Sequence, residues 1–138
     1  MNPTHKVIWA GGEQFVGSTA SGHSLVIDGH RQVAASPMEL MLLSAASCAC
    51  IDVVMILQKA RQKIVDVWVE ISGQRREEMP KYYTAVHMHF VVKGTGVGKT
   101  HVERAIQLAM DKYCSASAQV AALAKITTDY EIVEADSR

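Results

Sequence analysis

The chain has 138 residues, 49% of them hydrophobic, and its 14 basic side chains are balanced by 14 acidic ones. This length predicts a single domain over residues 1–138, with roughly two thirds of its surface buried on folding. Because the net charge is zero, no long-range field would attract nucleic acid or an anionic membrane, and neither is expected as a partner. Three cysteines and no recognisable signal peptide favour a reducing, cytoplasmic compartment.

Alternating patterns predict three short strands at the start of the chain, over residues Lys6–Trp9, Gln14–Ser18 and His23–Asp28. A glycine pair between the first two predicts a hairpin. The polar connection that follows, His30–Ala35, carries Arg31 towards the next element. Most loop arginines are simply solvated, but Arg31 could reach over the surface of that element.

A long apolar helix is predicted from Ser36 to Gln62. Its first turn carries a capping box, with Ser36 as N-cap, Pro37 at the first helical position and Glu39 reaching back. A helix that is apolar on every face must be buried on every face, so this one should be the spine of the fold. Asp52 would be costly in lipid, which disfavours a membrane span.

The remaining pattern gives two long strands, two helices and a last strand. Their predicted ranges are Ile64–Ser72, Tyr82–Lys93, Thr100–Tyr113, Ser117–Ala124 and Thr127–Val133. The first two should form a long hairpin in an antiparallel sheet, with the apolar helix on one face. The whole order is βββαββααβ, an α+β fold.

Cys48 is the first candidate for chemistry. It lies about three turns inside the helix, beyond the reach of the helix dipole, so it needs a cation or base from elsewhere to become a thiolate. The alternative is a small packing residue. Ser44, Cys48 and Asp52 fall on one stripe at i, i+4 and i+8, which makes a polar seam on the helix, whereas Cys50 faces elsewhere.

Cys114 is the second candidate, in the segment YCSAS between two predicted helices, where free amides could favour a thiolate. If Cys48 and Cys114 converge, they make a dithiol centre that can cycle through a disulfide. The spacing is not that of a CxxC motif, and two cysteines without further ligands make a poor zinc site, so no metal or other cofactor is expected.

Two other patterns could mark binding sites. The segment GTGVGKT resembles a phosphate-binding loop, but Gly94 and Gly98 enclose three residues where that loop needs four, so a turn between strand and helix is favoured. His87 and His89 share one strand face and could ligate a metal. No carboxylate is evidently placed beside them, which favours a solvated or interfacial face.

The stretch SPMELMLLSAASCACIDVVMIL followed downstream by KYCSAS resembles the OsmC/Ohr family of osmotically induced and organic hydroperoxide resistance proteins. It is most similar to the OsmC-like branch with SPME before the helix, IDVV after the cysteine and KYCS at the second cysteine. The resemblance implies an intertwined homodimer with central helices back to back, and a thiol peroxidase without metal or haem. The implied reductant is a dithiol, such as a protein-bound lipoyl group.

Carried over by position, Cys48 would attack an organic hydroperoxide and Cys114 would resolve the resulting sulfenic acid. Better-known members of the family place a Glu directly after the Pro, paired with an Arg that holds the thiolate. Here Met38 fills that position. Glu39, one residue later, and Arg31, in the preceding loop, are the candidates for these two roles.

An alternative from another functional class is a non-catalytic dimer that binds a small molecule or lipid. Three methionines of the predicted helix, Met38, Met41 and Met55, could line an adaptable apolar pocket.

Overall fold

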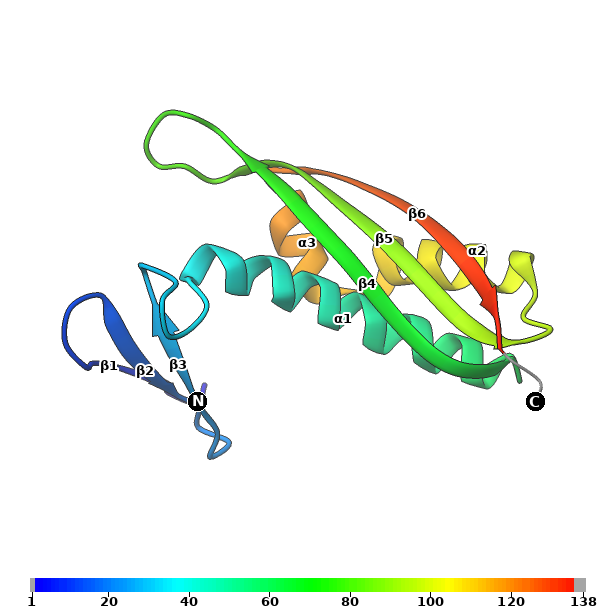
Figure 1. Cartoon of the computed structure of the whole chain (residues 1–138), viewed down its shortest axis with the longest axis horizontal. Coiled ribbons are helices and arrows are strands. Elements are labelled where there is room, and N and C mark those ends of the chain that lie inside the picture. The colour runs from blue at the N-terminus through cyan, green and yellow to red at the C-terminus, as the bar shows by residue number, and fades with distance from the viewer. Residues whose placement is uncertain (1, 136–138) are drawn as a thin grey trace. The chain divides into compact units, whose positions relative to one another are not determined.

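A computed structural model describes residues 2–135 and confirms the expected α+β fold and the order of its elements. Its strands form two three-stranded sheets (Figure 1). The residues pack into two compact units, one extending to Met41 and the other starting at Leu42. Each unit is described by itself, and the single-domain expectation stays a prediction.

The first unit contains an antiparallel sheet in the order β1 (Lys6–Trp9), β2 (Gln14–Ser18) and β3 (Ser24–Asp28). The predicted ranges of these strands are confirmed to within one residue. Gly11 and Gly12 both have positive φ, 100° and 55°, in the turn between β1 and β2. This left-handed backbone explains the glycine pair, since side chains disfavour it.

Asp28 organises the loop that carries Arg31. Its side chain is only 2% exposed, and its carboxylate accepts backbone N–H groups from three loop residues, His30 at 2.9 Å and Gln32 and Val33 at 3.0 Å. These bonds, led by the one from Val33, lower the pKa of Asp28. The ionised Asp28 therefore holds the loop in one conformation.

The central helix, α1, spans Pro37–Lys59. The predicted capping box is confirmed, because Ser36 N–H donates to Glu39 Oε1 at 3.0 Å and Glu39 N–H donates to Ser36 Oγ at 3.2 Å. The helix ends before the predicted Gln62 because Arg61 adopts a positive φ of 60°. The Gln62 N–H then donates back to the Leu57 carbonyl at 3.0 Å, which closes the last turn.

One face of α1 is buried and another is exposed. The buried residues are Ala45, Ala46, Ala49, Val53 and Leu57. On the opposite side Leu43, Ile51 and Met55 are each at least half exposed. The prediction that the helix is buried on every face is thus wrong for a single chain. The helix has the length and composition of a membrane span, but its buried face makes it a core helix.

The sheet of the second unit has the order β4 (Lys63–Arg75), β5 (Tyr83–Thr95) and β6 (Lys125–Glu134). β4 and β5 form the expected antiparallel hairpin, but β6 runs parallel to β5, so this sheet is mixed where an antiparallel one was expected. Two helices connect β5 to β6, and such a crossover returns the chain in the same direction. Val86, Met88 and Phe90 of β5 are buried against the helices.

The crossover consists of α2 (Lys99–Leu108), a π-helical turn over Ala109–Tyr113 and α3 (Ser115–Ala121) (Figure 1). The N-cap of α2 is Gly98, which makes no side-chain cap, so the helix begins one residue before the predicted Thr100. The predicted turn at GTGVGKT is confirmed.

Two amides of that turn already have partners. Gly96 N–H donates to the Glu134 carboxylate at 3.0 Å, and Gly98 N–H donates to Gln62 Oε1 at 2.8 Å. A carboxylate at this position would repel a phosphate, which argues against nucleotide binding.

Exchanging Asp28 for Asn tests the role of the carboxylate in the loop. Because the pKa of Asp28 is lowered on folding, its stabilising effect is present above its ordinary pKa of 3.8 and is lost as pH falls through the lower folded value. We expect Asp28→Asn to lower the melting temperature near neutral pH, with the difference from wild type closing as pH falls below 3.8. Thermal unfolding of both proteins across that range measures it, and a difference that does not change with pH would contradict the account.

Candidate active site

Three side chains of the second unit converge at the middle of α1. The Cys48 and Cys114 sulfurs and a carboxylate oxygen of Asp52 all lie within 4.8 Å of one another. The sequence predicted both cysteines as candidates and placed Asp52 on the same stripe as Cys48, but it could not show that Cys114 joins them. The structure brings the three together.

α1 places Cys48 and Asp52 one turn apart on one face, where both are half-buried. Cys50 lies about 200° around the helix from Cys48, and burial raises the pKa of its thiol. Cys50 is therefore a packing residue that points away from the pair, as the sequence predicted.

The π-helical turn places Cys114. The Cys114 N–H donates to the Ala109 carbonyl at 2.7 Å, which widens the last turn of the helix and ends it. Cys114 then acts as N-cap of α3, where its sulfur accepts the Ser117 N–H at 3.3 Å and its thiol donates to Ser117 Oγ at 2.9 Å. A further acceptor, the Ala45 carbonyl of α1, lies 3.8 Å from the sulfur.

The two thiols have different surroundings. Cys114 is 3% exposed, whereas Cys48 is half-buried. Burial raises the pKa of Cys114, the hydrogen bonds with Ser117 partly oppose this rise, and the neighbouring Cys48 adds to it. Cys114 is therefore held as a neutral thiol around pH 7.

Arg31 and Glu39 belong to the other unit. Arg31 is exposed, with φ 59°, and its N–H donates to the Asp28 carbonyl at 3.1 Å. The Glu39 carboxylate serves as the cap partner of Ser36. Their expected roles beside Cys48 stay predictions. Asp52 is the carboxylate that the structure adds to the pair.

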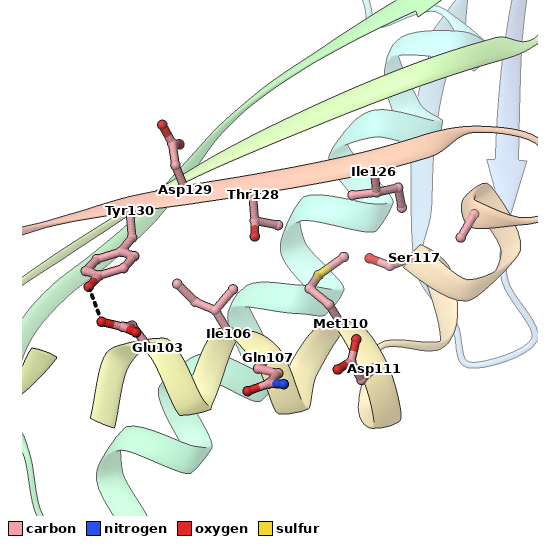
Figure 2. A pocket seen from close by; sticks show the side chains of 11 residues that line it. Glu103, Ile106, Gln107, Met110, Asp111, Ser117, Ile126, Thr128, Asp129 and Tyr130 are labelled. Carbon is pink, nitrogen blue, oxygen red and sulfur yellow. Dashed lines mark hydrogen bonds between the residues drawn. The ribbon is translucent and has the colours of Figure 1, made fainter. Parts of the chain in front are cut away.

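A pocket of about 810 Å³ opens between β6 and the crossover helices (Figure 2). It meets the cysteine site only at Ser117, which lines it. Its lining residues include the acidic Glu103 and Asp111, together with Asp129, whose carboxylate points to the other side of β6, and none is basic. The methionines expected to line a pocket, Met38, Met41 and Met55, do not line this one, and small-molecule binding remains an alternative function.

The outer face of the second sheet carries a ladder of histidines and carboxylates, formed by His87, His89, Asp129 and Glu131. Asp129 Oδ1 lies 3.0 Å from His87 Nε2 and 2.7 Å from His89 Nδ1, and Glu131 Oε1 lies 3.0 Å from His89 Nε2. Figure 2 shows Asp129 pointing away from the pocket, on the other side of β6 from Thr128 and Tyr130.

The expectation that no carboxylate stands beside the two histidines is therefore wrong. Asp129 and Glu131 alternate along β6 as His87 and His89 do along β5, and this shared spacing was the available signal. It could not be used without the parallel register, which sets His89 opposite Asp129.

Comparison with known proteins agrees with this fold. The family model described as OsmC-like protein matches residues 29–129. Protein YhfA of Escherichia coli K12 is 43% identical over 94% of this chain and 98% of its own length. A hypothetical protein from Aquifex aeolicus, solved by crystallography, is 28% identical, with a TM-score of 0.88 and 99% of each chain covered.

A crystal structure from Legionella pneumophila, described as an organic hydroperoxide resistance protein OsmC and predicted redox protein, shares the fold. Its identity is 16%, its TM-score 0.69, and the match covers 95% of this chain and 97% of that one. The mixed α+β fold built on a long apolar helix is the fold of this OsmC structure. This chain belongs to the OsmC-like family.

The ladder predicts a pH dependence. Both ring nitrogens of His89 face carboxylates, and hydrogen bonds to Glu131 and then Asp129 raise its pKa above 6.5. A group whose pKa is raised on folding stabilises the fold at pH values below its ordinary pKa. This contribution is lost as the pH rises through the pKa of the folded state. The pKa of Asp129 is lowered, first of all by its hydrogen bond with His89, so the contribution is lost again at acidic pH, where Asp129 takes up a proton. The ladder should thus stabilise most between about pH 4 and 6.5.

We expect the imidazole signal of His89 in an NMR titration to show a midpoint above 6.5. Glu131→Gln should lower that midpoint, because it replaces the charged acceptor that raises the pKa most with a neutral amide. Glu70→Gln is the matched control, because Glu70 pairs opposite His89 but its carboxylate accepts from Trp68. A wild-type midpoint at or below 6.5 would count against the ladder.

Proposed function

We propose that the protein reduces organic hydroperoxides through a dithiol–disulfide cycle of Cys48 and Cys114, and so protects the cytoplasm against oxidative stress. The observation that carries the proposal is the approach of the two sulfurs, which lie within 4.8 Å of each other. A sulfur–sulfur bond is about 2.05 Å long, so the remaining distance can be closed by side-chain rotation and small backbone shifts. Membership of the OsmC-like family supports the same chemistry.

In the first step the Cys48 thiolate attacks the distal oxygen of the hydroperoxide. The O–O bond breaks, the alkoxide takes a proton and leaves as the alcohol, and Cys48 becomes a sulfenic acid. In the second step the Cys114 sulfur attacks the Cys48 sulfur. Water leaves, and a disulfide forms. An external dithiol then reduces the disulfide by thiol–disulfide exchange.

The different burial of the two thiols supports this assignment of roles. The hydroperoxide must reach the attacking sulfur, and Cys48 is the more exposed of the pair. Cys114 is buried, and its raised pKa keeps it protonated until a sulfenic acid forms beside it. Ser117 can then turn its hydroxyl to donate to the Cys114 sulfur as that sulfur loses its proton.

Cysteine variants test the cycle. In stoichiometric reactions of the reduced protein with cumene hydroperoxide, Cys48→Ser should abolish peroxide consumption, because it removes the attacking sulfur. Cys114→Ser should still consume one equivalent but stop at the sulfenic acid, which dimedone traps and intact mass detects. Cys50→Ser is the matched control and should behave as wild type. The proposal fails if wild-type Cys48 reacts no faster than free cysteine.

We further propose that the protein is a homodimer in which α1 packs against α1 of a second copy. Leu43, Ile51 and Met55 lie on one helix face and are 54%, 60% and 50% exposed. An apolar stripe of this length on a core helix is typical of a subunit interface. The resemblance of the sequence to the OsmC/Ohr family implies the same contact.

Ile51→Glu tests the dimer. A charge buried in an apolar interface without a partner costs roughly 3–5 kcal/mol, which would raise the dimer dissociation constant at least about 100-fold. Leu123→Glu is the control, since Leu123 is 65% exposed after α3 and lies off the stripe. Sedimentation velocity should show dimers for the wild type and the control, and monomers for Ile51→Glu. A monomeric wild-type protein would refute the proposed contact.

A further inference from the structure

The cysteine site holds one more donor than a dithiol cycle requires. Asp52 offers a carboxylate oxygen within 4.8 Å of both sulfurs, and the cycle described above assigns it no step. Two thiols and one carboxylate are also the ligand types that zinc binds in proteins. We propose that the reduced protein binds one thiophilic divalent cation, with Zn²⁺ as the type case, through Cys48, Asp52 and Cys114.

The geometry fits a tetrahedral ion. With zinc–sulfur bonds of about 2.3 Å, the ligand atoms of a tetrahedral site stand about 3.8 Å apart. The three atoms here are separated by 4.8 Å at most, so rotations of the side chains suffice to close the site. The three residues supply three ligands and leave the fourth position to water.

The electrostatics also favour a cation. Within residues 2–135, no ion pair joins Asp52 to a basic side chain. Two thiolates beside a carboxylate would repel one another in this part of the fold, and a divalent ion removes that repulsion.

Burial holds one ligand of the site in place, and the sulfur ligands set its preference among metal ions. Cys114 is almost fully enclosed, with Ser117 N–H donating to its sulfur, so one ligand is held in place before the ion arrives. Cys48 and Asp52 are half-buried and remain open to an entering ion. Sulfur ligands favour zinc over magnesium or calcium, which prefer oxygen.

Metal binding shares the site of the proposed peroxide reduction but does not depend on that chemistry. A cation on the Cys48 sulfur would occupy the electron pair that attacks a hydroperoxide. The metal-bound form would thus be a protected, reduced state of the dithiol. Binding to the reduced protein without any peroxide separates the two proposals.

The test uses reduced full-length protein with Cys50→Ser, which leaves only the two site thiols. Zn²⁺ is titrated in competition with a chromophoric chelator, and alkylation by iodoacetamide is followed by intact mass. We expect one Zn²⁺ per chain, protection of both thiols from alkylation, and release of roughly two protons per ion from the thiols. A chelator should restore alkylation of both.

Two variants identify the ligands. Asp52→Asn keeps the shape of the side chain but loses its charge, and it should weaken Zn²⁺ binding by more than the roughly 10-fold that loss of an outer-shell partner costs. Cys114→Ser should weaken Zn²⁺ binding further. The protein that retains Cys50 should bind Zn²⁺ as tightly as the Cys50→Ser protein does. An Asp52→Asn affinity equal to wild type, or binding that leaves either thiol free to alkylate, would overturn the assignment. Metal binding in a protein that is inert to hydroperoxide would leave this inference standing and refute the peroxidase.

Discussion

The contact between Cys114 and the middle of α1 is the one on which the site depends. The chain leaves α1, completes the β4–β5 hairpin and runs through α2 before Cys114 returns to within 3.8 Å of the Ala45 carbonyl. The π-helical turn ends α2 at this point and lets Cys114 cap α3. Without that return, Cys48 would be a single thiol on an apolar helix, with Asp52 one turn away.

Burial, rather than a basic partner, distinguishes the two thiols. Cys114 is enclosed and protonated, and Cys48 is the accessible sulfur. The acidic Asp52 beside them does not stabilise a thiolate by its charge, but it completes a donor set for a cation. We therefore regard peroxide reduction and metal binding as competing uses of one site, in which an ion and a hydroperoxide exclude each other at Cys48.

Local patterns predicted most of the fold, and long-range pairing accounts for what they missed. The capping box of Ser36 and Glu39 lies within one turn, so the sequence alone could predict it. The ladder of His89 with Asp129 depends on the parallel register of β6, which no local pattern encodes. Likewise, local context and the family resemblance marked Cys48 and Cys114 as candidates, but only the crossover geometry shows that they meet.

The most direct test of this account measures whether Cys48 and Cys114 prefer each other to an external thiol. The reduced protein is equilibrated with mixtures of reduced and oxidised glutathione, quenched with acid and analysed by intact mass and peptide mapping. The account predicts a form two hydrogens lighter than the reduced chain, with the Cys48 and Cys114 peptides cross-linked and Cys50 free. Glutathione adducts on Cys48 or Cys114, without an internal disulfide at any ratio, would contradict it.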